Sequence, residues 1–232
     1  MFPATFFDFN GVLVNDEVVH FETFREVLAA APWAVALSEH DYLHRYLGFD
    51  DAGAFRAILE DAGQKPSATQ IAELIEAKRP LYMARARQAL PTFAGAAELI
   101  QRRAAAGPAL VVSGALRDEI ELGLEVLGVR SSILHIVAAE DTQACKPDPE
   151  GYLLGIQWLT ARGQEAAARR GLVIEDSLAG VEAAKAAGLP CIGVTHTYSQ
   201  DELSRAGCDA VVDSLVGIDD ALLTALFHRL YG

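Results

Sequence analysis

The sequence predicts an α/β protein in which a parallel sheet is interrupted, after its first strand, by an all-helical insert. Short apolar runs typical of buried strands alternate with helical patterns from residue 90 onward, and such alternation indicates βαβ units. Residues 15–88, in contrast, contain almost no β-branched runs and are predicted to form successive helices. We therefore expect a core formed by residues 1–14 and 89–232 and a helical unit formed by residues 15–88.

The helical insert is predicted from apolar residues at helical spacing and from residues that cap or stop a helix. Pro80 lies inside the last predicted helix, where it either kinks the helix or begins a new segment. The predicted helices cover residues 16–31, 38–46, 51–62 and 67–89.

The core is predicted to alternate short buried strands with helices. The strands cover residues 5–7, 109–112, 133–138, 171–174, 191–194 and 210–212. The helices cover residues 96–106, 116–127, 150–160, 178–187, 201–206 and 219–230. The carboxyl ends of parallel strands meet at one edge of a sheet, where ligands bind. Polar residues that follow these strands are therefore candidates for a common site.

Composition narrows the possible partners. The chain has 232 residues, a mass of 24.9 kDa and a formal net charge of −13. This charge disfavours binding to nucleic acid or to an anionic membrane, which requires clustered Lys and Arg, but it leaves room for a small phosphorylated substrate. Three cysteines, no secretory signal and no long apolar window predict a cytoplasmic protein without a membrane span. We expect a monomer or a weak dimer.

Charged and hydroxyl side chains follow four of the predicted strands. They are Asp8, Ser113 beside Gly114, Lys146, and the pair Glu175 and Asp176. Two carboxylates about 5 Å apart repel by roughly 3 kcal/mol at an effective dielectric constant of 20, so three of them require a counter-ion or raised pKa values. Oxygen ligands favour Mg²⁺, while a lysine and a serine hydroxyl suit a phosphate group.

Each of these residues also has a simpler interpretation when it is taken alone. Ser113 and Gly114 are typical of a strand-to-helix turn, and a loop lysine such as Lys146 is by default solvated. The acids Glu175 and Asp176 could simply begin the next helix, where negative charge is favourable. The combination of all four segments is what indicates a site.

Four segments together resemble the motifs of the haloacid dehalogenase (HAD) superfamily, in its β-phosphoglucomutase and phosphoglycolate phosphatase branch. They are Asp8–Leu13, Val111–Gly114, Lys146–Pro149 and Val173–Gly188. The resemblance covers essentially the whole chain. It implies a Rossmann-like core, a mobile helical cap formed by residues 15–88, and Mg²⁺-dependent phosphoryl transfer through an aspartyl-phosphate.

The resemblance also implies roles for individual residues. Asp8 would be the nucleophile, and Ser113, Gly114 and Lys146 would bind the phosphate of a small metabolite. Magnesium would be held by Asp8, Asp176 and the backbone carbonyl of Asn10, with Glu175 acting directly or through water.

Asn10 departs from the family pattern, in which a second aspartate serves as general acid and base. An amide cannot exchange a proton near neutral pH, and losing such a group typically costs about 10²–10⁴-fold in rate. Three interpretations remain open: a slow or divergent phosphatase, a non-catalytic phospho-ligand-binding or regulatory protein, or a variant engineered to trap a complex.

Other branches of the superfamily fit less well. A Mg²⁺-independent dehalogenase would lack the paired acids Glu175 and Asp176. A phosphonate-cleaving enzyme uses a cap lysine for a Schiff base, but nothing marks Lys65 or Lys78 as buried. A sugar-phosphate mutase, the second alternative, carries an arginine in a cap loop where segment 48–51 presents acids that would disfavour further negative charge. A phosphate monoester hydrolase is the leading prediction.

Overall fold

The computed structural model describes residues 2–47 and 49–232, and the chain divides into two compact units. The first unit comprises Met1–Asn15 and Pro91–Gly232, and the second comprises Asp16–Leu90. The predicted boundaries, at residues 14/15 and 88/89, lie one and two residues before those of the structure. Gly48, which opens the predicted acidic loop segment 48–51, lies outside the described residues.

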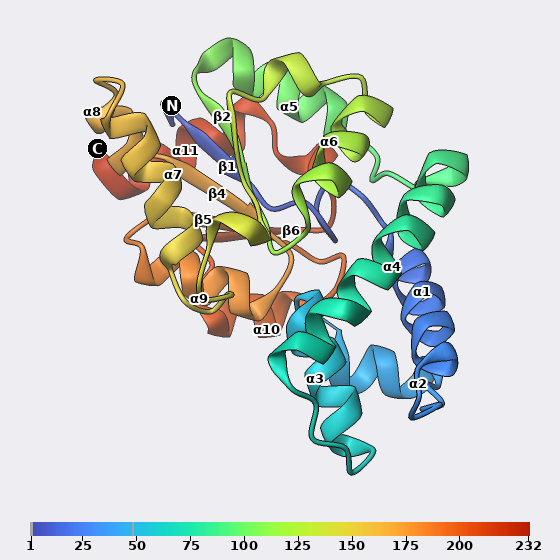
Figure 1. The fold of residues 1–232 in the computed structure, drawn as a ribbon. Coiled ribbons are helices and arrows are strands. Elements are labelled where there is room, and N and C mark those ends of the chain that lie inside the picture. The colour runs from blue at the N-terminus through green and yellow to red at the C-terminus, as the bar shows by residue number, and fades with distance from the viewer. Residues whose placement is uncertain (1, 48) are drawn as a thin grey trace. The chain divides into compact units, whose positions relative to one another are not determined.

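The first unit is built on a six-stranded sheet whose described strand pairs are all parallel (Figure 1). The strand order is β3-β2-β1-β4-β5-β6, so β1 lies between β2 and β4. The strands are β1 (Thr5–Phe7), β2 (Ala109–Val112), β3 (His135–Val137), β4 (Leu172–Glu175), β5 (Cys191–Val194) and β6 (Ala210–Val212). This arrangement confirms the predicted Rossmann-like α/β class.

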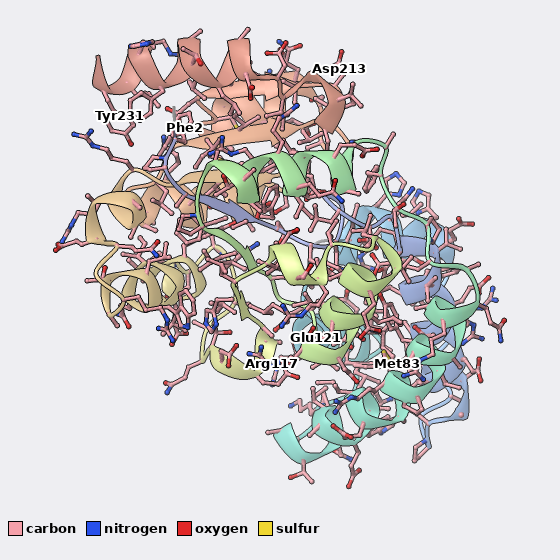
Figure 2. The ribbon with its side chains drawn as sticks, turned by 90° about the horizontal axis from the view of Figure 1, so that it is seen from above. Phe2, Met83, Arg117, Glu121, Asp213 and Tyr231 are labelled. Carbon is pink, nitrogen blue, oxygen red and sulfur yellow. The ribbon has the colours of Figure 1, made fainter. Side chains whose placement is uncertain are left out.

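Helices cover both faces of the sheet (Figure 1). On one face lie α5 (Ala96–Ala106), α6 (Arg117–Val126) and α11 (Asp220–Tyr231), and on the other lie α7 (Glu150–Thr160), α9 (Leu178–Ala186) and α10 (Gln200–Ala206). Buried side chains from the sheet and the second group of helices, including Phe6, Leu110, Val173, Tyr152 and Val181, form one continuous core. Figure 2 shows Phe2 beside Tyr231 of α11, with ring centroids 6.4 Å apart.

Several short elements of the first unit differ from the prediction. The strand predicted over 133–138 is shorter, and Glu175 is the last residue of β4 rather than a residue that follows it. The structure adds the helix α8 (Glu165–Arg169) and the 3₁₀ turns η2 (Arg130–Ser132), η3 (Ala139–Asp141) and η4 (Leu215–Gly217). Elements of three to five residues are too short to reveal a helical period in the sequence.

The second unit is all-helical, as predicted. It contains α1 (Glu17–Ala30), α2 (Glu39–Asp41), the π-helix η1 (Tyr42–Tyr46), α3 (Asp51–Asp61) and α4 (Ala68–Ala89). Pro80 lies inside α4, so it does not begin a new segment. The helix predicted over 38–46 is split, and its second half widens into a π-helix that buries both Tyr42 and Tyr46. Their hydroxyls donate to Glu17 and Asp61, at 2.7 Å each.

The side chain of Lys78 is fully buried inside the second unit, although nothing in the sequence analysis marked this lysine as buried. Its Nζ lies 2.6 and 2.8 Å from the two carboxylate oxygens of Asp51 and 2.8 Å from Nδ1 of His20. The position falls on the inward face of α4 between Leu74 and Tyr82, a spacing that could have revealed its burial. The charge of Asp51 is therefore compensated within the unit, which weakens the expectation that segment 48–51 repels anions.

No helix among residues 2–47 and 49–232 combines the length and apolarity needed to cross a bilayer.

Candidate active site

Lys146 bonds two carboxylates at the carboxyl edge of the sheet. Its Nζ donates to Asp8 Oδ1 at 2.5 Å, to Glu175 Oε1 at 2.6 Å and to the carbonyl oxygen of Val112 at 3.1 Å. Asp8 follows the central strand β1, and its N–H donates to the Ile174 carbonyl oxygen at 3.0 Å, which continues the pairing of β1 with β4. Three segments distant in sequence therefore meet at one ammonium group.

Glu175 is completely buried and its carboxylate is surrounded by donors. Oε1 accepts from Lys146 at 2.6 Å and from the Tyr152 hydroxyl at 2.9 Å. Oε2 accepts from the N–H of Asp176 at 3.1 Å, and from the N–H and hydroxyl of Ser177 at 3.2 and 3.0 Å. A carboxylate offers about four lone-pair positions, so these five donors occupy the acceptor capacity of Glu175. Gly180, in the first turn of α9, permits this packing, because a β-carbon there would overlap the carboxyl group.

Asp176 follows β4 and is 4% exposed. The Thr197 hydroxyl donates to its Oδ2. On another side lies Gly11, whose φ of +75° is in the left-handed region that favours glycine, and a β-carbon there would overlap the Asp176 carboxyl group. The Asn10–Gly11 turn and the loop after β4 are thus in direct contact.

Ser113 and Asn10 lie beside each other at the ends of adjacent strands. The Ser113 hydroxyl is 3.4 Å from Asn10 Oδ1, and it accepts from the N–H of Ala115 at 3.2 Å. Gly114 is exposed in the turn between β2 and α6. The sequence-predicted pair Ser113 and Gly114 therefore presents a hydroxyl and an exposed bend at the edge that carries Asp8.

Burial and the charges of neighbouring carboxylates raise the pKa values of Asp8 and Asp176. Burial raises the pKa of Asp8 to about 7 against the opposing charge of Lys146, and Glu175 adds to the increase. Burial, followed by the charges of Glu175 and Asp8, raises the pKa of Asp176 well above its usual range. Burial alone would lower the pKa of Lys146, but Asp8 and Glu175 raise it above its usual value. One ammonium thus faces three acids whose charges it cannot fully balance.

The donor chemistry of this cluster fits a divalent cation. Asp8, Glu175 and Asp176 each offer a carboxylate oxygen within 4.8 Å of the others. Carboxylate oxygens are ligands that Mg²⁺ prefers. Because one ammonium group cannot balance three carboxylates, the cluster also favours a bound cation electrostatically. The pKa values of Asp8 and Asp176 are raised first by burial and then by the neighbouring carboxylates, and a bound cation would oppose both effects.

Three contacts around the cluster were not predicted from the sequence. They involve Tyr152 of α7, which donates to Glu175, and the dipeptide His196 and Thr197, which follows β5. The position of the dipeptide in the sequence could have indicated these contacts, because polar residues within three positions after the predicted strand 191–194 lie near the sheet edge that carries Asp8. Tyr152 carries no such signal, since an aromatic residue inside a helix is ordinarily a core residue.

Comparison with known proteins identifies the family. The family model for haloacid dehalogenase-like hydrolases matches residues 5–194. The chain is 33% identical to protein CbbY of Rhodobacter capsulatus over 211 residues, covering 88% of this chain and 90% of that protein. It is 29% identical to validoxylamine A 7'-phosphate phosphatase of Streptomyces hygroscopicus subsp. limoneus over 215 residues, covering 89% and 92% of the two chains.

Solved structures share the fold. β-Phosphoglucomutase from Clostridium difficile superposes with a TM-score of 0.83 at 20% identity over 99% of both chains. An Asp-to-Asn variant of CbbY from Rhodobacter sphaeroides, in complex with xylulose-(1,5)bisphosphate, superposes with a TM-score of 0.78 at 27% identity, covering 93% of this chain and 95% of that one.

Proposed function

The chain belongs to the haloacid dehalogenase-like hydrolase family, and on that premise we propose that it is a Mg²⁺-dependent phosphatase of a small phosphorylated metabolite. The observation that carries this proposal is the Lys146 ammonium bonded to Asp8 and Glu175 next to Asp176. Relatives named as phosphatases of phosphorylated compounds support it. The net charge of −13 disfavours nucleic-acid and membrane partners, and the three free cysteines favour the cytoplasm. A monomer or weak dimer remains our expectation.

Asp8 is the proposed nucleophile. A carboxylate oxygen of Asp8 forms a bond to phosphorus while the bond to the leaving alkoxide breaks, which gives an aspartyl-phosphate. Water then attacks the phosphorus, releases inorganic phosphate and restores Asp8. Lys146 holds Asp8 in place and compensates the negative charge of the phosphoryl oxygens, to which Ser113 and Gly114 offer a hydroxyl and backbone N–H groups.

Asp8, Asp176 and the backbone carbonyl of Asn10 are the proposed protein ligands of Mg²⁺. Glu175 is assigned to act through water, because five donors already occupy its oxygens. When bound, the cation would neutralise the clustered carboxylates and polarise the phosphoryl group.

Asn10 limits the proposed reaction, because its amide can neither protonate the leaving alkoxide nor activate water. We therefore expect slow turnover of ordinary phosphate esters together with retained binding of Mg²⁺ and substrate. The structural relative is an Asp-to-Asn variant in complex with xylulose-(1,5)bisphosphate, so an exchange of this kind is compatible with ligand binding in that protein.

The test is phosphate release from a panel of sugar, nucleotide and small-acid phosphates with Mg²⁺. The parent should release phosphate weakly or not at all, and Asn10→Asp should gain at least about tenfold, the lower part of the general-acid range. Asn15, the chain's other asparagine, is exposed, so Asn15→Asp makes the same chemical change at an exposed position and should gain nothing.

Three outcomes would contradict the proposal in different ways. A vigorous parent that gains nothing from Asn10→Asp would show that Asn10 is not at the acid's position. Unchanged phosphate release by Asp8→Ala would remove Asp8 as the nucleophile. No release by either the parent or Asn10→Asp, combined with ligand-induced stabilisation, would favour a phospho-ligand-binding protein instead.

A further inference from the structure

The loop after β5 contacts the two loops that carry the proposed metal ligands. Thr197 donates its hydroxyl hydrogen to Asp176 Oδ2. His196 Nδ1 lies 2.7 Å from the carbonyl oxygen of Gly11, and because a carbonyl oxygen only accepts, Nδ1 carries the hydrogen of this bond. Adjacent residues therefore reach Asp176 on one side and the turn after Asp8 on the other.

These contacts close into a ring. Gly11 packs directly against the Asp176 carboxyl group, where no β-carbon would fit. The ring runs from Thr197 to Asp176, from Asp176 to Gly11, from Gly11 to His196, and back through the peptide bond that joins His196 to Thr197. A rotation of the Asp176 side chain or a shift of the Gly11 peptide would break at least one of these contacts.

The His196 ring is itself held in place. It stacks on Phe93 with ring centroids 3.7 Å apart and planes 6° from parallel. The N–H of Phe93 donates to the carbonyl oxygen of Leu13 at 3.1 Å, so Phe93 is tied to the same loop that His196 bonds. His196 is thus supported from its face and bonded at its edge, which suits a rigid positioning group rather than a mobile one.

We propose that His196 and Thr197 are positioning residues that set the affinity of the site for a divalent cation. Thr197 holds the Asp176 carboxylate, and His196 holds the Gly11–Val12 peptide, which directly follows the Asn10 carbonyl. Together they keep both proposed ligands in the orientation that a shared cation needs, without touching the cation themselves. Groups that orient metal ligands in this way typically account for about 10- to 100-fold in metal affinity or activity. This inference rests on the proposed metal site at Asp8 and Asp176.

The test is calorimetric titration with MgCl₂, which measures binding independently of turnover. Thr197→Val keeps the shape of the side chain and removes the hydroxyl, so its Mg²⁺ dissociation constant should rise about 10- to 100-fold, while Thr197→Ser should bind like the parent. Thr195→Val is the matched control, because the Thr195 hydroxyl faces Asp213 at 3.5 Å and not the cluster; it should leave Mg²⁺ affinity unchanged.

His196 is tested with a second pair of variants. His196→Phe keeps a ring to stack on Phe93 but loses the N–H, whereas His196→Gln keeps a donor. We expect weaker Mg²⁺ binding by the first and partial retention by the second. This pair also keeps the inference testable if Thr197→Val fails to fold, which thermal melting in chelator would reveal.

Asp176→Asn separates failure of this inference from failure of the proposed function. If Asp176→Asn abolishes Mg²⁺ binding while Thr197→Val and His196→Phe bind like the parent, the positioning role is wrong and the metal site stands. If the parent binds no Mg²⁺, or Asp176→Asn binds it equally well, the metal site is wrong and the positioning role falls with it.

Discussion

At the scale of single residues, Lys146 donates to two of the three clustered acids. We therefore expect its loss to lower the stability of the folded protein more than the loss of a surface lysine. Lys146→Met leaves Asp8 and Glu175 buried without their cation, and breaking a buried ion pair typically costs about 3–5 kcal/mol. We expect that loss in the free energy of unfolding, measured by urea titration in chelator near pH 8, where Asp8 is mostly ionised.

Lys185→Met is the control for this prediction. Lys185 pairs with Asp209 at 2.8 Å, but its side chain is 38% exposed, and surface pairs contribute only about 0–1 kcal/mol. Equal losses of stability in Lys146→Met and Lys185→Met would contradict the assignment of Lys146 as a buried counter-ion.

The sequence was sufficient to bring Asp8, Lys146 and Asp176 together because each follows a predicted strand, and parallel strands present their ends at one edge. It was insufficient for Thr197, whose contact with Asp176 depends on the path of a loop, and no local pattern encodes that path. The burial of Lys78 was missed for another reason: a charged residue on an apolar helical stripe is interpreted by its charge, although its partner Asp51 permits burial.

At the scale of elements, the turn after β1 is the piece of backbone on which the site depends. Gly11 and Gly163 have nearly the same left-handed φ, +75° and +74°, but Gly163 has no other atom within 4 Å of a built β-carbon, whereas Gly11 faces Asp176. Gly163→Ala should therefore cost only the strain of a left-handed residue, about 1–2 kcal/mol.

Gly11→Ala pays the same strain and must also displace the Asp176 carboxylate, so we expect a larger loss of stability together with weaker binding of Mg²⁺. Urea unfolding and MgCl₂ titration of both variants measure the two effects. If Gly11→Ala matches Gly163→Ala in both measurements, the close contact between the turn and Asp176 is not important for the site.

The limits of helices and strands were predictable where the sequence has a clear apolar periodicity or a residue that ends the element, and they were not predictable elsewhere. The strand 5–7 and the helices that follow β1 and β2 have clear apolar patterns, and the structure places elements there. The π-helix η1 was not predictable, because its widened turn accompanies tertiary hydrogen bonds from Tyr42 to Glu17 and from Tyr46 to Asp61.

At the scale of the whole molecule, the chain was predictable as a sheet with a helical insert because the two parts differ in composition along long stretches. Each unit has its own buried cluster: one around Phe6 and Tyr152, the other around Phe24 and Phe55. Each cluster gives its unit a core independent of the other, which is why a long insert can follow β1 without disturbing the sheet.

The acid cluster links the stability of the whole metal-free protein to pH. In the folded state the pKa of Asp8 is about 7, against an ordinary value of 3.8, so between those values the folded protein keeps a proton that the unfolded chain releases. This group's contribution to stability therefore falls as pH rises from about 4 to about 7 and is constant above about 8. The raised pKa of Asp176 acts in the same direction.

Asp8→Asn cannot titrate, so in chelator the melting temperature of the parent should fall relative to Asp8→Asn as pH rises from about 4 to about 8. A relative fall of at least about 2 °C, roughly 1 kcal/mol for a chain of this size, is expected. Asp213→Asn, which removes an exposed carboxyl, should not reproduce the difference. Because Mg²⁺ compensates ionised acids, adding it near pH 8 should stabilise the parent more than it does near pH 5. A parent that gains stability relative to Asp8→Asn over this range would show that the Asp8 carboxyl is held as a charged group, with Lys146 alone sufficient to balance it.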